Sequence, residues 1–90
     1  MAFRKDPDAV LDYTVDWEAW LDGDTIATSD WVVPDGIIED AATSTTTSAT
    51  IWLSGGTEGA AYRIVNRIVT AAGRTDDRTI VINCRGGLSA

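Results

Sequence analysis

Polar and apolar residues alternate along several stretches of the 90-residue chain, most clearly from Ala9 onward. The apolar side chains there fall on every second position and are Leu11, Tyr13, Val15 and Trp17. The positions between them hold the polar residues Asp12, Thr14 and Asp16. Successive side chains of a strand point to opposite faces, so this period of two predicts a half-buried β-strand.

Further strands are predicted where β-branched and aromatic residues gather between turn signals. The segments are 25–33 ("TIATSDWVV"), 37–40 ("IIED"), 49–53 with Ala49, Ile51 and Leu53 facing inward, 61–70 and 78–85 ("RTIVINCR"). "PDG" at 34–36 ends the first of them, and "AAGRTDD" at 71–77 is predicted to be the loop of a hairpin over 61–85. The Thr/Ser block at 43–50 fits either a loop or a solvent-facing edge strand.

The only helical spacing lies between Trp17, Trp20 and Leu21, which predicts a single helical turn before an Asp-Gly turn. About seven short strands with turn signals about every 8 to 12 residues are typical of an all-β, immunoglobulin-like antiparallel β-sandwich. We place this sandwich at residues 9–85. Residues 1–8 are predicted to form an extended N-terminal arm that docks on a neighbouring protein, and residues 86–90 a C-terminal tail.

Three glycines lie in "LSGGTEGAAY" at 53–62, which raises the question of a phosphate-binding loop. Such a loop needs the pattern G-x-x-x-x-G-K-[ST] followed by a helix, and here there is neither the lysine nor the helix. The alternative is a structural corner between two strands, in which a tyrosine hydroxyl bonds to backbone upstream. Its residues are Leu53, Gly55, Gly56, Gly59 and Tyr62, with the glycines permitting positive φ where the chain reverses.

Charge is distributed unevenly along the chain, whose net charge is −7. Residues 1–40 hold eleven acidic and two basic residues, whereas residues 41–90 hold three acidic and five basic residues. A surface of this sign repels phosphates, so nucleic acid is not expected to be the main partner. The asymmetry fits either a solvated acidic face or contact between the acidic half of one copy and the arginines of a neighbour.

The residue types that support most catalytic and metal-binding chemistry are scarce. With one cysteine, Cys84, and no histidine, neither an internal disulfide nor a conventional metal cluster is expected. Cys84 is interpreted as a small buried hydrophobic residue. No apolar run reaches the length of a membrane helix, and "MAFRKDPDAV" has too few apolar residues for a signal peptide, so we expect a cytosol-like site of synthesis and no membrane partner.

The acidic residues do not single out a catalytic pair, and no catalytic residue, cofactor or metal is predicted. Asp22, Asp24 and Asp30 could together offer carboxylates to calcium. Aligned on a calcium-binding EF-hand loop from Asp22, however, the position of the bidentate acid is occupied by Val33. A plain Asp-Gly turn is the favoured interpretation.

Tryptophans and arginines are the candidate interaction residues. Trp17 and Trp31 are expected in the core, and Trp20 and Trp52 are expected to face a partner or a glycan. Four arginines fall on or beside the predicted hairpin and could form a basic edge, or could pair across strands with Asp76 and Asp77; they are Arg63, Arg67, Arg74 and Arg78. In the predicted arm, the candidate contacts are Phe3, Arg4 and Lys5.

The order of several short motifs resembles a family of small proteins encoded among the structural genes of tailed bacteriophages and prophages. The motifs are "DPDAVLDY" (6–13), "WVVP" (31–34), "WLSGG" (52–56) and "NRIVTAAGRTDDR" (66–78), and the resemblance extends roughly over residues 5 to 83. The ending "CRGGLSA" departs from the family's pattern, which leaves the C-terminal contact undefined. The resemblance implies a virion or virion-associated protein with an immunoglobulin-like fold and no known activity.

From this resemblance we expect a non-enzymatic virion protein made in the cytoplasm of a bacterial host. The leading expectation is a capsid decoration or cement protein that binds the lattice of the major capsid protein through its arm and its sheet edges. One alternative is a structural protein of the head–tail neck or the tail. A second is a glycan-binding module that uses exposed tryptophans. The expected partners are other virion proteins and further copies of the chain itself.

Overall fold

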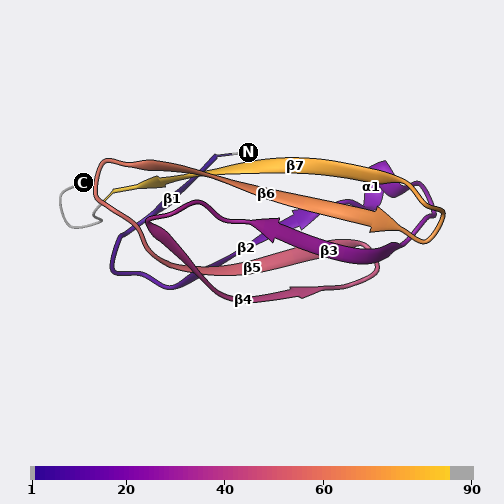
Figure 1. Ribbon diagram of the computed structural model, residues 1–90, viewed down its shortest axis with the longest axis horizontal. Coiled ribbons are helices and arrows are strands. Elements are labelled where there is room, and N and C mark those ends of the chain that lie inside the picture. Colours follow the sequence, from indigo (N-terminus) through magenta and orange to yellow (C-terminus); the bar gives the residue numbers. More distant parts are fainter. Residues whose placement is uncertain (1, 86–90) are drawn as a thin grey trace.

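The computed structural model describes residues 2–85, and this part of the chain consists almost entirely of β-strands (Figure 1). Its strands are β1 (Ala2–Lys5), β2 (Leu11–Asp16), β3 (Ile26–Val32), β4 (Ile37–Ser44), β5 (Ser48–Gly55), β6 (Ala61–Thr70) and β7 (Thr75–Cys84). The single turn of helix α1 (Glu18–Leu21) joins β2 to the segment before β3, as the tryptophan spacing predicted. The predicted all-β class is therefore confirmed. The predicted tail at 86–90 lies outside the described residues.

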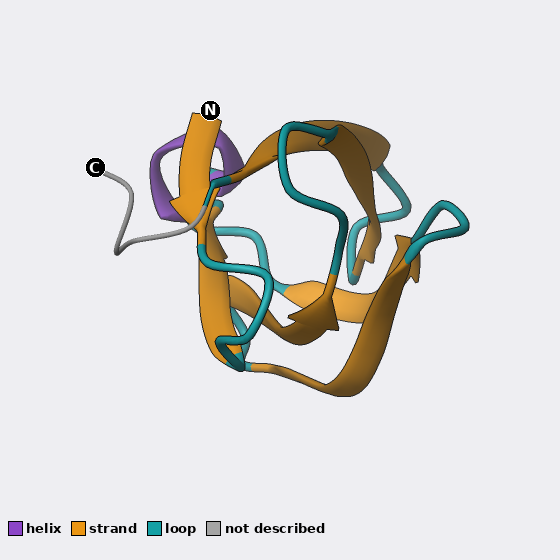
Figure 2. Ribbon diagram, turned by 90° about the vertical axis from the view of Figure 1, so that its left-hand side faces the viewer, coloured by secondary structure: helices purple, strands orange, loops and turns teal. Residues whose placement is uncertain are grey.

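The strands form two sheets that face each other. One sheet has the order β1-β7-β6-β3 and the other the order β2-β5-β4. In Figure 2, which looks along the long axis of the molecule, the two sheets lie on opposite sides of the core. All strand pairs are antiparallel except β1 and β7, which run parallel. The edge strands are thus β1 and β3 in one sheet and β2 and β4 in the other.

The alternating patterns predicted the faces of the longer strands correctly. In β2, Tyr13 and Val15 are buried and the alternating Asp12, Thr14 and Asp16 are exposed. The inward residues of β5 and β6 are all fully buried and are Ala49, Ile51, Leu53, Ile64, Asn66 and Ile68. Trp17 and Leu21, at either end of the helical turn, complete the core between the sheets. Leu11 is the exception, because it lies at the start of an edge strand and stays 39% exposed.

The N-terminal segment is more closely attached than its sequence indicated. Residues 2–5, expected as part of an extended arm that docks on a neighbouring protein, form β1 and pair with β7 from Ala2↔Val81 to Lys5↔Cys84. Phe3 packs against Tyr13 of the opposite sheet, with ring centroids 5.1 Å apart. β1 has only four residues, and its parallel partner β7 lies at the far end of the chain. The alternation of polar and apolar residues therefore did not predict this strand.

Two loop predictions also change. The Thr/Ser block divides into the end of β4, a turn at 45–47 and the start of β5, so both earlier interpretations describe part of it. The hairpin between β6 and β7 is present, but β7 begins at Thr75, so Asp76 and Asp77 belong to the strand and not to the loop. Pairing of Arg67 with Asp77 explains the longer strand, because opposite charges on facing positions stabilise the extended ladder.

Candidate interaction site

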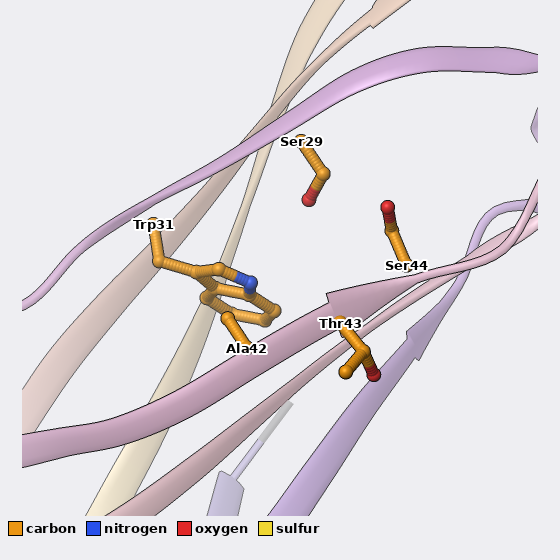
Figure 3. Close-up of a pocket in the computed structure, with 5 residues that line it drawn as sticks. All are labelled: Ser29, Trp31, Ala42, Thr43 and Ser44. Atoms are coloured by element: carbon orange, nitrogen blue, oxygen red, sulfur yellow. The ribbon is translucent and has the colours of Figure 1, made fainter.

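The two sheets separate along one side of the molecule, between the edge strands β3 and β4. A hollow of about 120 Å³ opens there and is lined by Ser29, Trp31, Ala42, Thr43 and Ser44. In Figure 3 the side chains of Ser29 and Ser44 point into the gap from opposite strands, and Ala42 lies beside the indole of Trp31. Thr43 points away from the gap. This side of the sandwich is therefore incompletely filled.

Strand β4 is the most exposed strand beside this hollow. Only Ile37, at its start, is buried, and residues 38–44 are all exposed. Ala42 pairs with the fully buried Ile51 and thus occupies an inward position, yet it is exposed because the opposite sheet does not cover it. A β-bulge lies between Glu39 and Ala41, after which residues 41–44 follow a regular ladder with β5. The outer edge of this regular part lacks a neighbouring strand among the described residues.

The opposite side of the sandwich, between β1 and β2, is closed. The ring contact between Phe3 and Tyr13 joins the two sheets there. Lys5 is only 1% exposed, and its Nζ donates to the carbonyl oxygens of Gly55 at 2.7 Å and Asp6 at 2.9 Å. Of the predicted arm contacts, Phe3 and Lys5 are therefore engaged within the chain, and Arg4 is exposed.

The charge around the open side is negative. Residues 6–62 contain no lysine or arginine. On β3, Asp30 faces Arg67 of β6 in the sheet register, so part of its charge is balanced. On β4, Glu39 and Asp40 are exposed, and neither forms an ion pair within residues 2–85. The open edge thus presents two carboxylates without a counter-charge.

Two of the four tryptophans, Trp31 and Trp20, occupy environments that differ from those expected. Trp17 is fully buried, but Trp31 is only half-buried because one side of its ring borders the hollow. Trp20, expected to face a partner, is half-buried against the core, with the guanidinium of Arg74 4.2 Å above its ring. Trp52 is 39% exposed on the outer face of β5. Of the two tryptophans expected to face a partner, Trp52 is thus the more exposed.

The arginines of the hairpin do not line up as one free basic edge. Arg67 forms a two-pronged ion pair with Asp77, with its Nε 2.7 Å from Oδ1 and its Nη2 2.9 Å from Oδ2. Arg78 lies over the Trp17 ring and donates to the carbonyl of Asp16. Arg63 is exposed.

Arg74 holds the helical turn onto the hairpin. Its guanidinium donates to the carboxylate of Asp24 and to the carbonyls of Trp20 and Leu21. Both Arg74 and Arg78 thus satisfy carbonyl oxygens near α1 and cover tryptophan rings. Their interactions favour a structural role at this end of the sandwich.

Asp24 serves the fold and is not arranged with Asp22 and Asp30 around an ion. A hydrogen bond from the Thr70 hydroxyl is the main cause that lowers the pKa of Asp24 to about 2, assisted by the backbone of Thr25 and by Arg74. Within residues 2–85 no group of three or more histidine, cysteine, aspartate or glutamate side chains could hold a metal ion. Asp22 adopts positive φ after the helical turn, as an Asp-Gly turn requires.

The glycine-rich segment has the geometry of a corner between sheets. The Thr57 amide donates to the Tyr62 hydroxyl over 3.0 Å, and Leu53 is buried at the end of β5. Gly55, Gly56 and Gly59 all have positive φ. At Gly56 an added Cβ would overlap Sγ of Cys84, which is buried as expected. The segment therefore brings the chain from one sheet to the other.

Sequence reasoning missed the buried amide of Asn66. Its Oδ1 accepts from Nε1 of Trp17 at 2.9 Å, and its Nδ2 donates to Oγ of Ser29 and to the carbonyl of Asp30. The amide thereby fixes β3 against β6 and positions Ser29 at the hollow. An asparagine at an inward position of the alternating segment 61–70 was the signal that could have found it.

A family model described as podophage GP4 fiber-tail adaptor protein gp77 matches residues 5–83. No curated protein matches the chain. Within the described residues, no helix has the length and apolar character needed to cross a membrane. The matched range includes every strand from the end of β1 to nearly the end of β7. The chain therefore belongs to the podophage GP4 fiber-tail adaptor protein gp77 family.

Proposed function

We propose that this protein is a non-enzymatic structural component of a phage tail, where it joins fibre and tail proteins. The observation that carries the proposal is the family match over residues 5–83, because an adaptor acts by binding other virion proteins. The match favours the tail-associated alternative over the capsid decoration that the sequence analysis put first. Virion location and partners among the tail proteins follow from the same family.

The arrangement of the strands supports an immunoglobulin-like fold. In the constant-type immunoglobulin sandwich, strands A, B, E and D form one sheet and strands C, F and G the other. Here β2, β5 and β4 occupy the places of B, E and D, and β3, β6 and β7 those of C, F and G. β1 differs, since it pairs in parallel with β7 and not with β2. The hydrogen bond from Thr57 to Tyr62 at the start of β6 corresponds to the tyrosine corner of that fold.

The surface of the sandwich suits an adaptor because its contacts can be made without rearranging the core. Closely packed side chains and the satisfied amide of Asn66 hold the two sheets in a fixed relation. The open edge of β4 offers backbone donors and acceptors to another protein. Trp52 and Ile38 add exposed apolar surface on the same three-stranded sheet, at 39% and 58% exposure. A rigid body with an unfilled edge can therefore connect two larger components.

The proposal is tested with a phage from which this gene is deleted. We expect particles with filled heads and tails that lack fibres and do not adsorb to the host, and we expect added purified protein to restore fibre attachment. Electron microscopy counts the fibres, and adsorption assays measure the rescue. If the mutant particles keep their fibres but their heads lose stability, the protein decorates the capsid and the tail proposal is wrong.

A further inference from the structure

We propose that the free edge of β4 receives an extended, basic segment of a partner tail protein, which adds a fourth strand to the sheet β2-β5-β4. This inference rests on the proposed function, because the partner is taken to be a protein of the tail. It specifies the surface that binds and the chemistry of the segment that occupies it. Three features of the open side support it.

The first feature is the contrast between the two sides of the sandwich. On the β1–β2 side, the contact of Phe3 with Tyr13 and the buried Lys5 close the gap between the sheets. On the β3–β4 side, the gap stays open as the hollow beside Trp31 (Figure 3). The inward residues Ala42 and Ser44 are exposed there, although their partners on β5 are buried. One further strand beside β4 would therefore be needed to cover the inner face of the sandwich on this side.

The second feature is the backbone edge of β4. After the bulge near Asp40, residues 41–44 pair regularly with β5 and have no strand on their other side within residues 2–85. Native proteins usually protect such an edge with proline, lysine or a covering segment, and residues 41–44 contain no proline or lysine. An extended peptide that pairs with this edge gains main-chain hydrogen bonds and directs alternate side chains inward. One small side chain, such as valine or threonine, would then lie beside Trp31 in the hollow.

The third feature is charge, and it determines the kind of partner. Glu39 and Asp40 form no ion pair within the described residues, and the chain has no basic residue between positions 6 and 62. A strand with lysine or arginine beside these carboxylates is attracted, whereas an acidic strand is repelled. The other free edge, β3, is less suitable, because Asp30 faces Arg67 and its charge is partly balanced.

The test uses purified tail particles from the deletion phage and the full-length recombinant protein. In the double variant Glu39→Lys/Asp40→Lys, we expect binding to the particles about 10-fold weaker or worse, since two attractions become repulsions. The matched control is Asp8→Lys/Asp12→Lys, which changes the net charge equally on the opposite edge strand β2 and in the turn before it, and should bind as the wild type does. Circular dichroism and thermal melting check that each variant is folded.

A second measurement uses the wild-type protein and so does not depend on how the variants fold. Hydrogen exchange of the bound protein should show new protection at those amides of 41–44 that point away from β5, while the amides of β2 exchange as in the free protein. If wild-type protein binds the particles but 41–44 exchange unchanged, or if both double variants bind equally well, the edge-strand inference is overturned and the tail function stands. If wild-type protein does not bind the particles, the proposed function fails, and this inference fails with it.

Discussion

Replacement of glycine by alanine in the corner tests whether Gly56 is required for its conformation, for its close contact with Cys84, or for both. Gly56 and Gly59 have similar φ values of +95° and +84°. An alanine in this region costs about 1–2 kcal/mol of folding free energy at either position. Only at Gly56 does the new Cβ also overlap Sγ of Cys84, because at Gly59 there is no atom within 4 Å. Overpacking of this kind adds about 1–3 kcal/mol.

We therefore expect Gly56→Ala to lower the free energy of unfolding by about 2–5 kcal/mol and Gly59→Ala by only about 1–2 kcal/mol. For a domain of this size, each kcal/mol corresponds to about 4–8 °C in Tm. Urea denaturation followed by tryptophan fluorescence measures both values. Gly59→Ala is the matched control, since it changes the same residue type at a similar φ in open space.

A double-mutant cycle with Cys84→Ala isolates the steric part. Alanine lacks Sγ, so the overlap disappears in Gly56→Ala/Cys84→Ala while the cost of positive φ remains. The double variant should thus be more stable than the sum of the two single effects by about 1–3 kcal/mol. If the two single effects add within about 0.5 kcal/mol, the close contact at Gly56 has no energetic importance and this reasoning is refuted.

Two further predictions concern polar groups of the core and of the helical turn. The Tyr13 hydroxyl is buried without a hydrogen-bond partner within residues 2–85, and burial is the main cause that raises its pKa. Tyr13→Phe should therefore increase the free energy of unfolding, measured by urea denaturation, by about 1 kcal/mol. A decrease of similar size would contradict this. The pKa of Asp24 is lowered from 3.8 to about 2 in the folded protein, so its contribution to stability is present above about pH 4 and is lost as the pH falls through about 2. In Asp24→Asn, Tm should therefore fall less steeply than in the wild type as the pH is lowered across this range. An equally steep fall in both proteins would show that Asp24 does not contribute to the pH dependence of stability.

Much of the architecture could be predicted from local patterns, because burial in a sheet repeats every two residues. The alternation of Tyr13, Val15 and Trp17 marked the inner face of β2, and that of Ala49, Ile51 and Leu53 marked the inner face of β5. The glycines of the corner and the single helical turn were also visible, since positive φ and helical spacing are local properties. The order of motifs along the chain indicated a phage structural protein, and the family match agrees with that origin.

Interactions between distant residues could not be predicted in this way. Trp20 resembled an exposed contact residue until the fold placed Arg74 over its ring, 54 positions away. Lys5 resembled an arm residue until pairing of β1 with β7 buried it beside the carbonyl of Gly55. In both cases a charged or aromatic side chain has the same local sequence pattern whether it faces solvent or another part of the chain.

The sequence by itself determined the strand periods, the inward-facing residues and the negative charge of residues 6–62. Only the tertiary structure decided which edge of the sandwich is closed and which is open. The reason is that closure depends on what reaches each edge: Phe3 and Lys5 reach one side, and among the described residues nothing covers Ala42 and Ser44 on the other. That difference arises from the packing of two sheets against each other, and a period of two along a single strand contains no information about it.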